Sequence, residues 1–190
     1  MIEGTLVNLR AREMTDLDRN YRWMNDREVT EHLAMRYPLS LAAEEMWIRE
    51  GSSKPIVYGV NVFFAIETKD GEHIGNISFH EMSVERRKAR LGIVIGDKAY
   101  WSKGYGTDSM LTFLRFAFDE MNLHRIDLTV DDDNLRGIAC YRKCGFVQEA
   151  RMRQVRFTRG AYRDQFVMGI LRDEFYALHG TTPLSEEVAS

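Results

Sequence analysis

The sequence from Leu91 to Phe146 reads LGIVIGDKAYWSKGYGTDSMLTFLRFAFDEMNLHRIDLTVDDDNLRGIACYRKCGF and begins with a strand, a glycine-containing loop and a helix in succession. The apolar run from Leu91 to Ile95 has the composition of a buried strand. The loop over residues 96–106 is rich in small and hydrogen-bond-donating residues. The helix that follows carries apolar residues at spacings of three and four, which predicts one buried face: Met110, Leu111, Leu114, Ala117, Phe118 and Met121.

This order of elements predicts an anion-binding site at the start of the helix. The first helical N–H groups have no partner within the helix, and the helix dipole adds partial positive charge there. Glycines such as Gly104 and Gly106 let a phosphate approach the main chain closely, and Lys103 adds a cation. The residues exclude two phosphate-binding classes. The chain has no Gly-Lys-Ser/Thr sequence of a P-loop, and Ser109 stands where a dinucleotide fingerprint requires its third glycine.

The segment Trp101-Ser102-Lys103-Gly104-Tyr105-Gly106-Thr107 resembles the pyrophosphate loop of the GNAT superfamily of acetyl-CoA-dependent N-acetyltransferases. The pattern of that family is Arg/Gln-x-x-Gly-x-Gly/Ala at the start of a helix. Gly104 and Gly106 match its glycines, whereas Trp101 occupies the Arg/Gln position. The resemblance implies that the backbone of this segment binds acetyl-CoA, with one side-chain contact changed. The residues concerned are Trp101, Ser102, Lys103, Gly104, Tyr105, Gly106 and Thr107.

Two later segments extend the resemblance to roughly residues 4–172. Asn134, followed by Ala139, Tyr141 and Lys143-Cys144-Gly145-Phe146, is similar to the second motif of the family. The segment from Phe157 to Asp164 resembles the Gly-x-Tyr-x-Asp hairpin of one branch. That branch contains the acetyltransferases of ribosomal-protein N-termini and the bacterial spermidine N-acetyltransferases.

The resemblance also implies roles for individual residues. Tyr141 is expected to be the general acid that protonates the departing thiolate, and to contact the co-substrate. Asn134 is expected to cap a helix and to bind the pantetheine arm. In the family, the strand before the loop diverges from the next strand, so that its free backbone groups pair with pantetheine like an added strand. The residues at this strand end are Ile93, Val94, Ile95 and Gly96.

The general base and the acceptor site are less specified by the sequence. Glu81, beside His80 near the end of a strand, is a candidate base, although a surface charge is the commoner role for such a residue. The segment that lines the acceptor site in relatives holds further candidates, which the sequence does not rank: Glu28, Glu31, His32, Arg36 and Tyr37. The acidic run Asp131-Asp132-Asp133 precedes a helix, so we expect it to serve capping rather than a metal, and we predict no metal site.

The remaining elements follow from periodicity and turn signals. The predicted strands are residues 5–10, 61–68, 73–82, 89–95, 126–130, 146–157 and 163–171. The predicted helices, apart from the central one, are residues 16–25 with a cap at Thr15 or Asp16, a segment after the Ser40 cap, and residues 135–144; residues 26–35 form a short helix of weaker signal. We therefore predict an α/β fold in which a mostly antiparallel sheet of six or seven strands carries helices on both faces. It forms one domain, residues 1–180, with a disordered tail at residues 181–190.

Composition limits the partners. The formal net charge of -3 argues against nucleic acid, which needs a basic face. The sequence has neither a run of about 18 apolar residues nor a signal-peptide pattern, so we expect no membrane association and a cytoplasmic location. Cys140 and Cys144, four residues apart on a predicted helix, are expected to be reduced thiols. The sequence does not fix the oligomeric state; a homodimer is one candidate, since dimers are common among relatives.

The function that these features predict is transfer of an acetyl group from acetyl-CoA to a primary amine, with a protein N-terminal α-amine as the first choice. An α-amino group has a pKa of about 7.7–8.0 and needs less help from a base than a lysine-like amine at about 10.4. One alternative acceptor is a small amine such as a polyamine, an aminoglycoside or an amino-acid derivative. Arg36 argues against spermidine, because relatives that use this polycation carry acidic residues there. A second alternative is a catalytically silent acyl-CoA-binding module.

Overall fold

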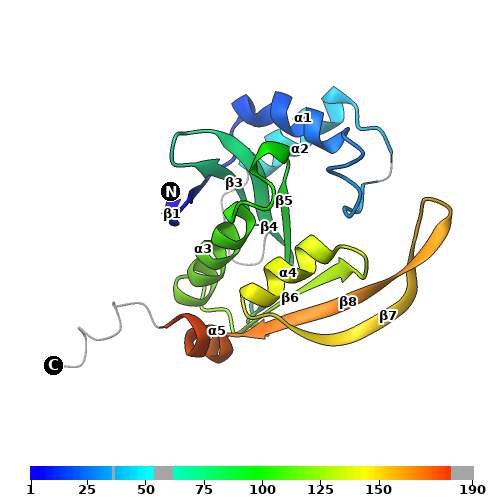
Figure 1. The fold of residues 1–190 in the computed structure, drawn as a ribbon. Helices are drawn as coiled ribbons and strands as arrows, with labels where there is room; N and C mark the ends of the chain where they lie inside the picture. Colours follow the sequence, from blue (N-terminus) through cyan, green and yellow to red (C-terminus); the bar gives the residue numbers. More distant parts are fainter. Residues whose placement is uncertain (36, 54–61, 181–190) are drawn as a thin grey trace.

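The computed structural model describes residues 1–35, 37–53 and 62–180, with the side chains of residues 51–53 left aside (Figure 1). One sheet of eight strands has the order β1-β2-β3-β4-β5-β6-β8-β7. The strands are β1 Ile2–Glu3, β2 Val7–Arg10, β3 Val62–Thr68, β4 His73–Ser83, β5 Lys88–Ile95, β6 Arg125–Asp131, β7 Val147–Thr158 and β8 Ala161–Leu171. The α-helices are α1 Leu17–Met24, α2 Leu41–Ser53, α3 Tyr105–Asp119, α4 Leu135–Lys143 and α5 Arg172–His179, with 3-10 turns at Met14–Asp16 (η1) and Lys98–Tyr100 (η2).

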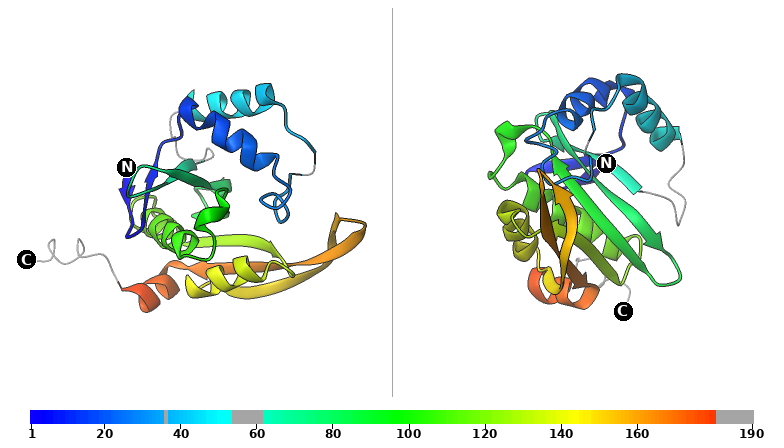
Figure 2. Two further views of the ribbon diagram at one scale, coloured as in Figure 1. Left: turned by 45° about the horizontal axis from the view of Figure 1, so that its top comes forward. Right: turned by 90° about the vertical axis from the view of Figure 1, so that its right-hand side faces the viewer.

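Helices cover both faces of this sheet, as predicted (Figures 1 and 2). Two neighbouring residues of β3 demonstrate this coverage, because successive side chains of a strand point to opposite faces of the sheet. The Phe63 ring lies 5.5 Å from the ring of Trp47 in α2, whereas the Phe64 ring lies 5.8 Å from that of Phe113 in α3. The predicted α/β architecture is therefore confirmed, with one strand more than the sequence indicated because the two-residue β1 was not predicted.

The buried face of α3 forms the centre of the core. Met110, Leu114, Ala117 and Phe118 are fully buried, as their spacing predicted. Phe113 was missed by the sequence analysis, yet it is fully buried and stacks on Phe79 of β4 with 4.4 Å between ring centroids. Leu111 and Met121, two other predicted members of that face, are only half-buried and pack at its margin.

The sheet opens between its two parallel strands. β5 and β6 pair only at Lys88 with Arg125, Ala89 with Ile126 and Arg90 with Asp127. Beyond that point β5 continues to pair with β4 as far as Ile95, and β6 continues to pair with β8 as far as Asp131. The inner edges of both strands are thus free of each other, and the divergence that the resemblance implied is present.

Three predictions about elements need correction. Residues 26–35 form turns and bends instead of a short helix, held by backbone bonds such as Thr30 N–H to the Asp26 carbonyl at 2.9 Å. Asp16 does not cap α1, because its carboxylate accepts hydrogen bonds from Arg10 and from the Glu13 amide. Helix α5 was not predicted; its start is fixed by Glu174, which accepts the Leu171 amide at 2.9 Å.

Other boundaries agree within a few residues, and the Ser40 cap is confirmed by the Ala43 N–H bond to its hydroxyl at 3.2 Å. The predicted tail at residues 181–190, the start of a strand at Asn61 and the candidate Arg36 lie outside the described residues. Within the part of the chain that is described, no helix combines the length and the apolar character that crossing a membrane requires.

Candidate active site

The loop after β5 is shaped by close packing and by left-handed backbone. Gly96 lies directly against the Trp23 ring, since a Cβ at this position would be 2.1 Å from the indole. Asp97 accepts the Ala99 amide at 3.0 Å and so begins η2. Ser102 has φ 58° and Gly104 has φ 92°, a region that glycine adopts without strain. The predicted loop is thus a series of tight turns that ends at the start of α3.

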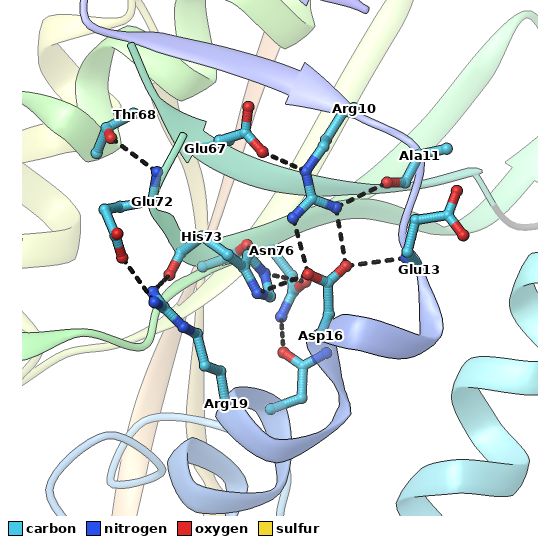
Figure 3. A network of polar contacts seen from close by, with 12 residues as sticks. Arg10, Ala11, Glu13, Asp16, Arg19, Glu67, Thr68, Glu72, His73 and Asn76 are labelled. Carbon is cyan, nitrogen blue, oxygen red and sulfur yellow. Dashed lines mark hydrogen bonds and ion pairs between the residues drawn. The ribbon is translucent and has the colours of Figure 1, made fainter. Parts of the chain in front are cut away.

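A polar network joins η1 and α1 to strands β2, β3 and β4 of the sheet (Figure 3). Arg10 of β2 binds both carboxylate oxygens of Asp16, at 2.9 and 2.7 Å, and also Glu67 of β3 at 2.5 Å. Asp16 Oδ1 is 3.2 Å from His73 Nδ1, and His73 in turn lies edge-on to the Trp23 ring at 4.8 Å. The network therefore supports the indole on which Gly96 rests.

The amino end of α3 offers uncapped amides. Gly104 is the N-cap residue, and no side chain of the described residues caps the helix there. The Asp108 carboxylate in the first turn is directed away to the amides of Leu6 and Val7, at 2.7 and 3.0 Å. A Cβ on Gly106 would stand 3.7 Å from Ile95 Cγ1 and 3.9 Å from Cys140 Sγ, so this glycine leaves room that a side chain would fill. These features fit the pyrophosphate of acetyl-CoA.

Trp101, which replaces the Arg/Gln of the family pattern, has a defined place. Its indole N–H donates to the Ile95 carbonyl at 2.6 Å, at the end of β5. The guanidinium of Arg136, in the first turn of α4, lies 3.8 Å from the centre of the indole. Arg136 was not singled out from the sequence, because no local pattern links it to a residue 35 positions earlier.

Asn134 and Tyr141 stand at the two ends of α4, as its N-cap and in its last turn. Asn134 is confirmed as the N-cap, accepting the Gly137 amide at 3.0 Å. Tyr141 is half-buried and packs 6.1 Å from the Phe146 ring. Burial raises the pKa of Tyr141 above its ordinary value, and the neighbouring thiols Cys140 and Cys144 add to the shift. The phenol is therefore protonated at neutral pH, as a general acid must be.

The two cysteines join α4 to the start of α3. Both are free thiols, and Cys144 is buried whereas Cys140 is half-buried. Cys140 Sγ lies 3.4 Å from Thr107 Oγ1, and Cys144 Sγ lies 3.9 Å from the Thr107 carbonyl. The nearby Cys144 thiol and the Thr107 hydroxyl lower the pKa of Cys140 below its ordinary value, although burial opposes them.

A second cluster lies at the far end of β6. Asp131 is buried; its carboxylate binds Arg156 of β7 and accepts Gln165 at 2.9 Å, while His32 Nδ1 is 3.2 Å away. Burial alone would raise the pKa of Asp131, but the hydrogen bonds from His32 and Gln165 and the charge of Arg156 lower it instead. His32, Thr129, Asp131, Arg156 and Gln165 line a cavity of about 260 Å³.

This cluster also bears on two sequence predictions. Asp131 was expected to serve a helix cap, but it is the centre of the hydrogen-bonded group. Ligand atoms of His32, Asp131 and Asp133 lie within 4.8 Å of one another, a spacing that a metal could use. Arg156, Gln165 and His32 all contact the Asp131 oxygens, so these described residues form a hydrogen-bonded network, and the absence of a metal stays a prediction.

The other acceptor candidates are not brought into the cavity lining. Glu28 pairs with Lys98 at 2.9 Å, Glu31 pairs with Arg159 at 2.5 Å, and Tyr37 is 83 % exposed. Glu81, the candidate base, is exposed and lies 3.2 Å from Arg90, which also binds Asp127 at the closed end of the β5–β6 opening. Its role as a base remains a prediction.

Comparisons with protein families, with curated proteins and with solved structures all find acetyltransferases similar to this chain. The family model described as an acetyltransferase (GNAT) domain matches residues 7–147. A spermidine N(1)-acetyltransferase of Escherichia coli (strain K12) is 32 % identical over 118 residues, 62 % of each chain. A ribosomal N-acetyltransferase-like protein of Bacillus subtilis (strain 168) is 28 % identical over 106 residues, 56 % of this chain and 57 % of that one. The crystal structure of a Vibrio cholerae spermidine N-acetyltransferase with CoA and spermine superposes with a TM-score of 0.80 at 26 % identity, over 90 % of this chain and 98 % of that one.

Proposed function

This chain belongs to the GNAT acetyltransferase family, whose members transfer the acetyl group of acetyl-CoA to an amine, and from this premise we propose that its acceptor is the N-terminal α-amine of a protein or peptide. Acetyl transfer from a thioester to an amine needs a held donor, a neutral amine and a proton for the departing thiolate. The residues around the β5–β6 opening can serve these three needs from two sides.

The donor side consists of the loop, the free edge of β5 and α4. Amides of Tyr105, Gly106 and Thr107 bind the pyrophosphate, and the inner edge of β5 near Val94 pairs with the pantetheine amides. Tyr141 gives its phenolic proton to the thiolate as the carbon–sulfur bond breaks. The phenolate that remains regains a proton from the newly acylated nitrogen or from solvent, which completes the proton transfer.

The acceptor side is the cavity around Asp131. An ionised carboxylate has no proton to give, so His32 Nδ1–H donates to Asp131 and leaves Nε2 as the basic nitrogen. We assign to His32 Nε2 the removal of a proton from the acceptor ammonium, directly or through one water. Asp131, fixed by Arg156, holds the imidazole in the required tautomer and orientation.

The observation that carries the choice of acceptor is the pairing of Asp131, which lines this cavity, and of two carboxylates that lie outside its lining. Asp131 binds Arg156, Asp133 lies 3.5 Å from Arg163, and Glu31 binds Arg159. A polyamine needs a surplus of negative charge to replace its hydration, and these carboxylates are already neutralised by arginines of the same chain. A single α-amine, with a pKa of about 7.7–8.0, makes no such demand.

A small-molecule amine is the second candidate, and the similarity to two spermidine N-acetyltransferases favours it. The test is the release of CoA from acetyl-CoA with a panel of acceptors at equal concentration. Peptides of varied N-terminal residue are compared with spermidine, an aminoglycoside and free amino acids. We expect the best peptide to exceed spermidine by at least about tenfold in kcat/KM; a spermidine rate above that of every peptide contradicts the proposal.

We make two further proposals, about the location of the enzyme and about its oligomeric state. The two free thiols suit the reducing cytoplasm, which is where we place the enzyme. We also propose a homodimer, following the family resemblance. Light scattering of the purified chain against concentration tests the second statement directly.

A further inference from the structure

We propose that Arg136 binds a phosphate of acetyl-CoA and supplies the cation that is lost at the loop position occupied by Trp101. This inference rests on acetyl-CoA being the donor and is independent of the identity of the acceptor. The class of ligand is a phosphate or diphosphate ester. CoA offers two such groups, the pyrophosphate and the 3′-phosphate, and the experiment below separates them.

The first observation is that the Arg136 guanidinium is held in place. Trp101 is anchored by its hydrogen bond to the Ile95 carbonyl at 2.6 Å, and the guanidinium lies 3.8 Å from the indole centre. A cation over an indole face is attracted by the ring quadrupole, and this interaction limits the rotamers of an otherwise exposed side chain. Less conformational entropy is then lost when the guanidinium binds a ligand.

The second observation is the position of Arg136 relative to the α3 amides. Cys140 follows Arg136 by four residues, so both lie on one face of α4 with Cβ atoms about 5–6 Å apart. Cys140 Sγ is 3.4 Å from Thr107 Oγ1 and 3.9 Å from the point where a Cβ on Gly106 would stand. Arg136 is therefore one helical turn from Cys140, which contacts the amides of residues 105–107 that we assign to the phosphate (the cradle). A long arginine side chain can reach a ligand bound there.

The third observation is chemical. A guanidinium presents paired N–H donors in a planar arrangement that matches two phosphate oxygens, and it keeps its free edge for a ligand while its face stacks on an indole. Trp101 thus keeps a structural role at the position where the family pattern places Arg or Gln, and the cation is supplied from α4. Arg142, exposed in the last turn of the same helix, provides a charge-matched control.

Calorimetric titration of CoA and of 3′-dephospho-CoA into Arg136→Ala, Arg142→Ala and the unaltered protein tests the proposal without any acceptor. A charge-assisted hydrogen bond predicts a loss on the order of 10- to 100-fold in CoA affinity for Arg136→Ala, with Arg142→Ala within about twofold of the unaltered protein. If Arg136 binds the 3′-phosphate, Arg136→Ala and the unaltered protein bind 3′-dephospho-CoA with equal affinity. If Arg136 binds the pyrophosphate, Arg136→Ala loses the same factor in affinity for both ligands. CoA binding by Arg136→Ala within about twofold of the unaltered protein overturns the proposal.

A rescue variant distinguishes the replacement of a cation from a general effect on α4. Adding Trp101→Arg to Arg136→Ala restores the family pattern, and we expect it to recover most of the lost CoA affinity, although loss of the indole bond to the Ile95 carbonyl lowers the melting temperature. No recovery in such a folded double variant overturns the statement that Arg136 replaces the loop cation. Since binding is measured with CoA alone, these results do not depend on which amine is the acceptor.

Discussion

The hydroxyl of Thr107 lies 3.4 Å from the sulfur of Cys140, and this contact joins the amino end of α3 to α4. It places a half-buried thiol beside the amides that we assign to the pyrophosphate. A group attached to the Cys140 sulfur should therefore prevent a phosphate from binding at these amides, and a bound phosphate should protect the thiol.

Alkylation of Cys140 by N-ethylmaleimide is predicted to compete with acetyl-CoA. The pKa of Cys140 is lowered from its ordinary value, so the reactive thiolate fraction, and with it the alkylation rate, rises at a lower pH than for an ordinary cysteine. Saturating CoA should slow the reaction at least about tenfold. Cys140→Ser identifies the site, and mass spectrometry measures the rate; equal rates with and without CoA contradict the placement.

The cradle itself is tested best at Gly106. A Cβ there makes only ordinary contacts of 3.7 Å and more within the protein, so Gly106→Val should keep most of the stability and weaken CoA binding at least about tenfold, because the side chain occupies the ligand space. Gly104→Val should also lose binding but destabilise the fold, since φ 92° costs a non-glycine residue roughly 1–2 kcal/mol. Calorimetry and thermal melting separate the two effects. Normal CoA binding by Gly106→Val contradicts the assigned location.

Tyr141→Phe is predicted to lower kcat by about 10²–10⁴-fold, the usual contribution of a general acid. The ring keeps its packing 6.1 Å from Phe146, so the melting temperature and the CoA affinity should change little. Rates are measured at saturating acetyl-CoA with the best amine. An unchanged kcat, with chemistry shown to limit the rate, leaves solvent as the acid.

His32→Asn retains a donor to Asp131 in place of Nδ1 and removes the basic Nε2. We expect kcat/KM for the amine to fall at least about tenfold at pH 7, with unchanged CoA affinity. The deficit should shrink above pH 9, where an α-amine with a pKa of about 8 is already neutral. Arg27→Gln, an exposed change in the same segment, serves as the control. A deficit that stays constant across pH points to acceptor positioning instead of proton removal.

Asp16→Asn is predicted to cost roughly 3 kcal/mol at neutral pH, because it leaves a partly buried Arg10 without one of its two carboxylates. Burial alone would raise the pKa of Asp16, but Arg10, the Glu13 amide and His73 lower it. This contribution is therefore complete above the unfolded pKa of about 3.9 and is lost as the pH falls through the lower folded pKa. Urea denaturation from pH 7 to pH 2.5 should show the two proteins converging in acid; a constant difference contradicts the assignment.

Much of the donor side could be predicted from sequence, because its determinants are local. The spacing of Met110, Leu114 and Phe118 follows from the helical repeat, and Gly104 stands where the backbone requires a positive φ. Asn134 precedes its helix directly and caps it as predicted. Such features depend on neighbours within one or two helical turns, so the order of residues alone indicates them.

The tertiary structure decided the contacts between residues that are far apart in the chain. Arg136 reaches Trp101, and His32 reaches Asp131 across 99 positions, only because the divergence of β5 from β6 and the β7–β8 hairpin set those segments side by side. The same arrangement gave Glu28 and Glu31 basic partners, and for this reason we propose His32 as the base in preference to them. Local propensity carries no information about these pairings, since they depend on sheet order and on which side chains complete each other's charge and hydrogen bonds when buried.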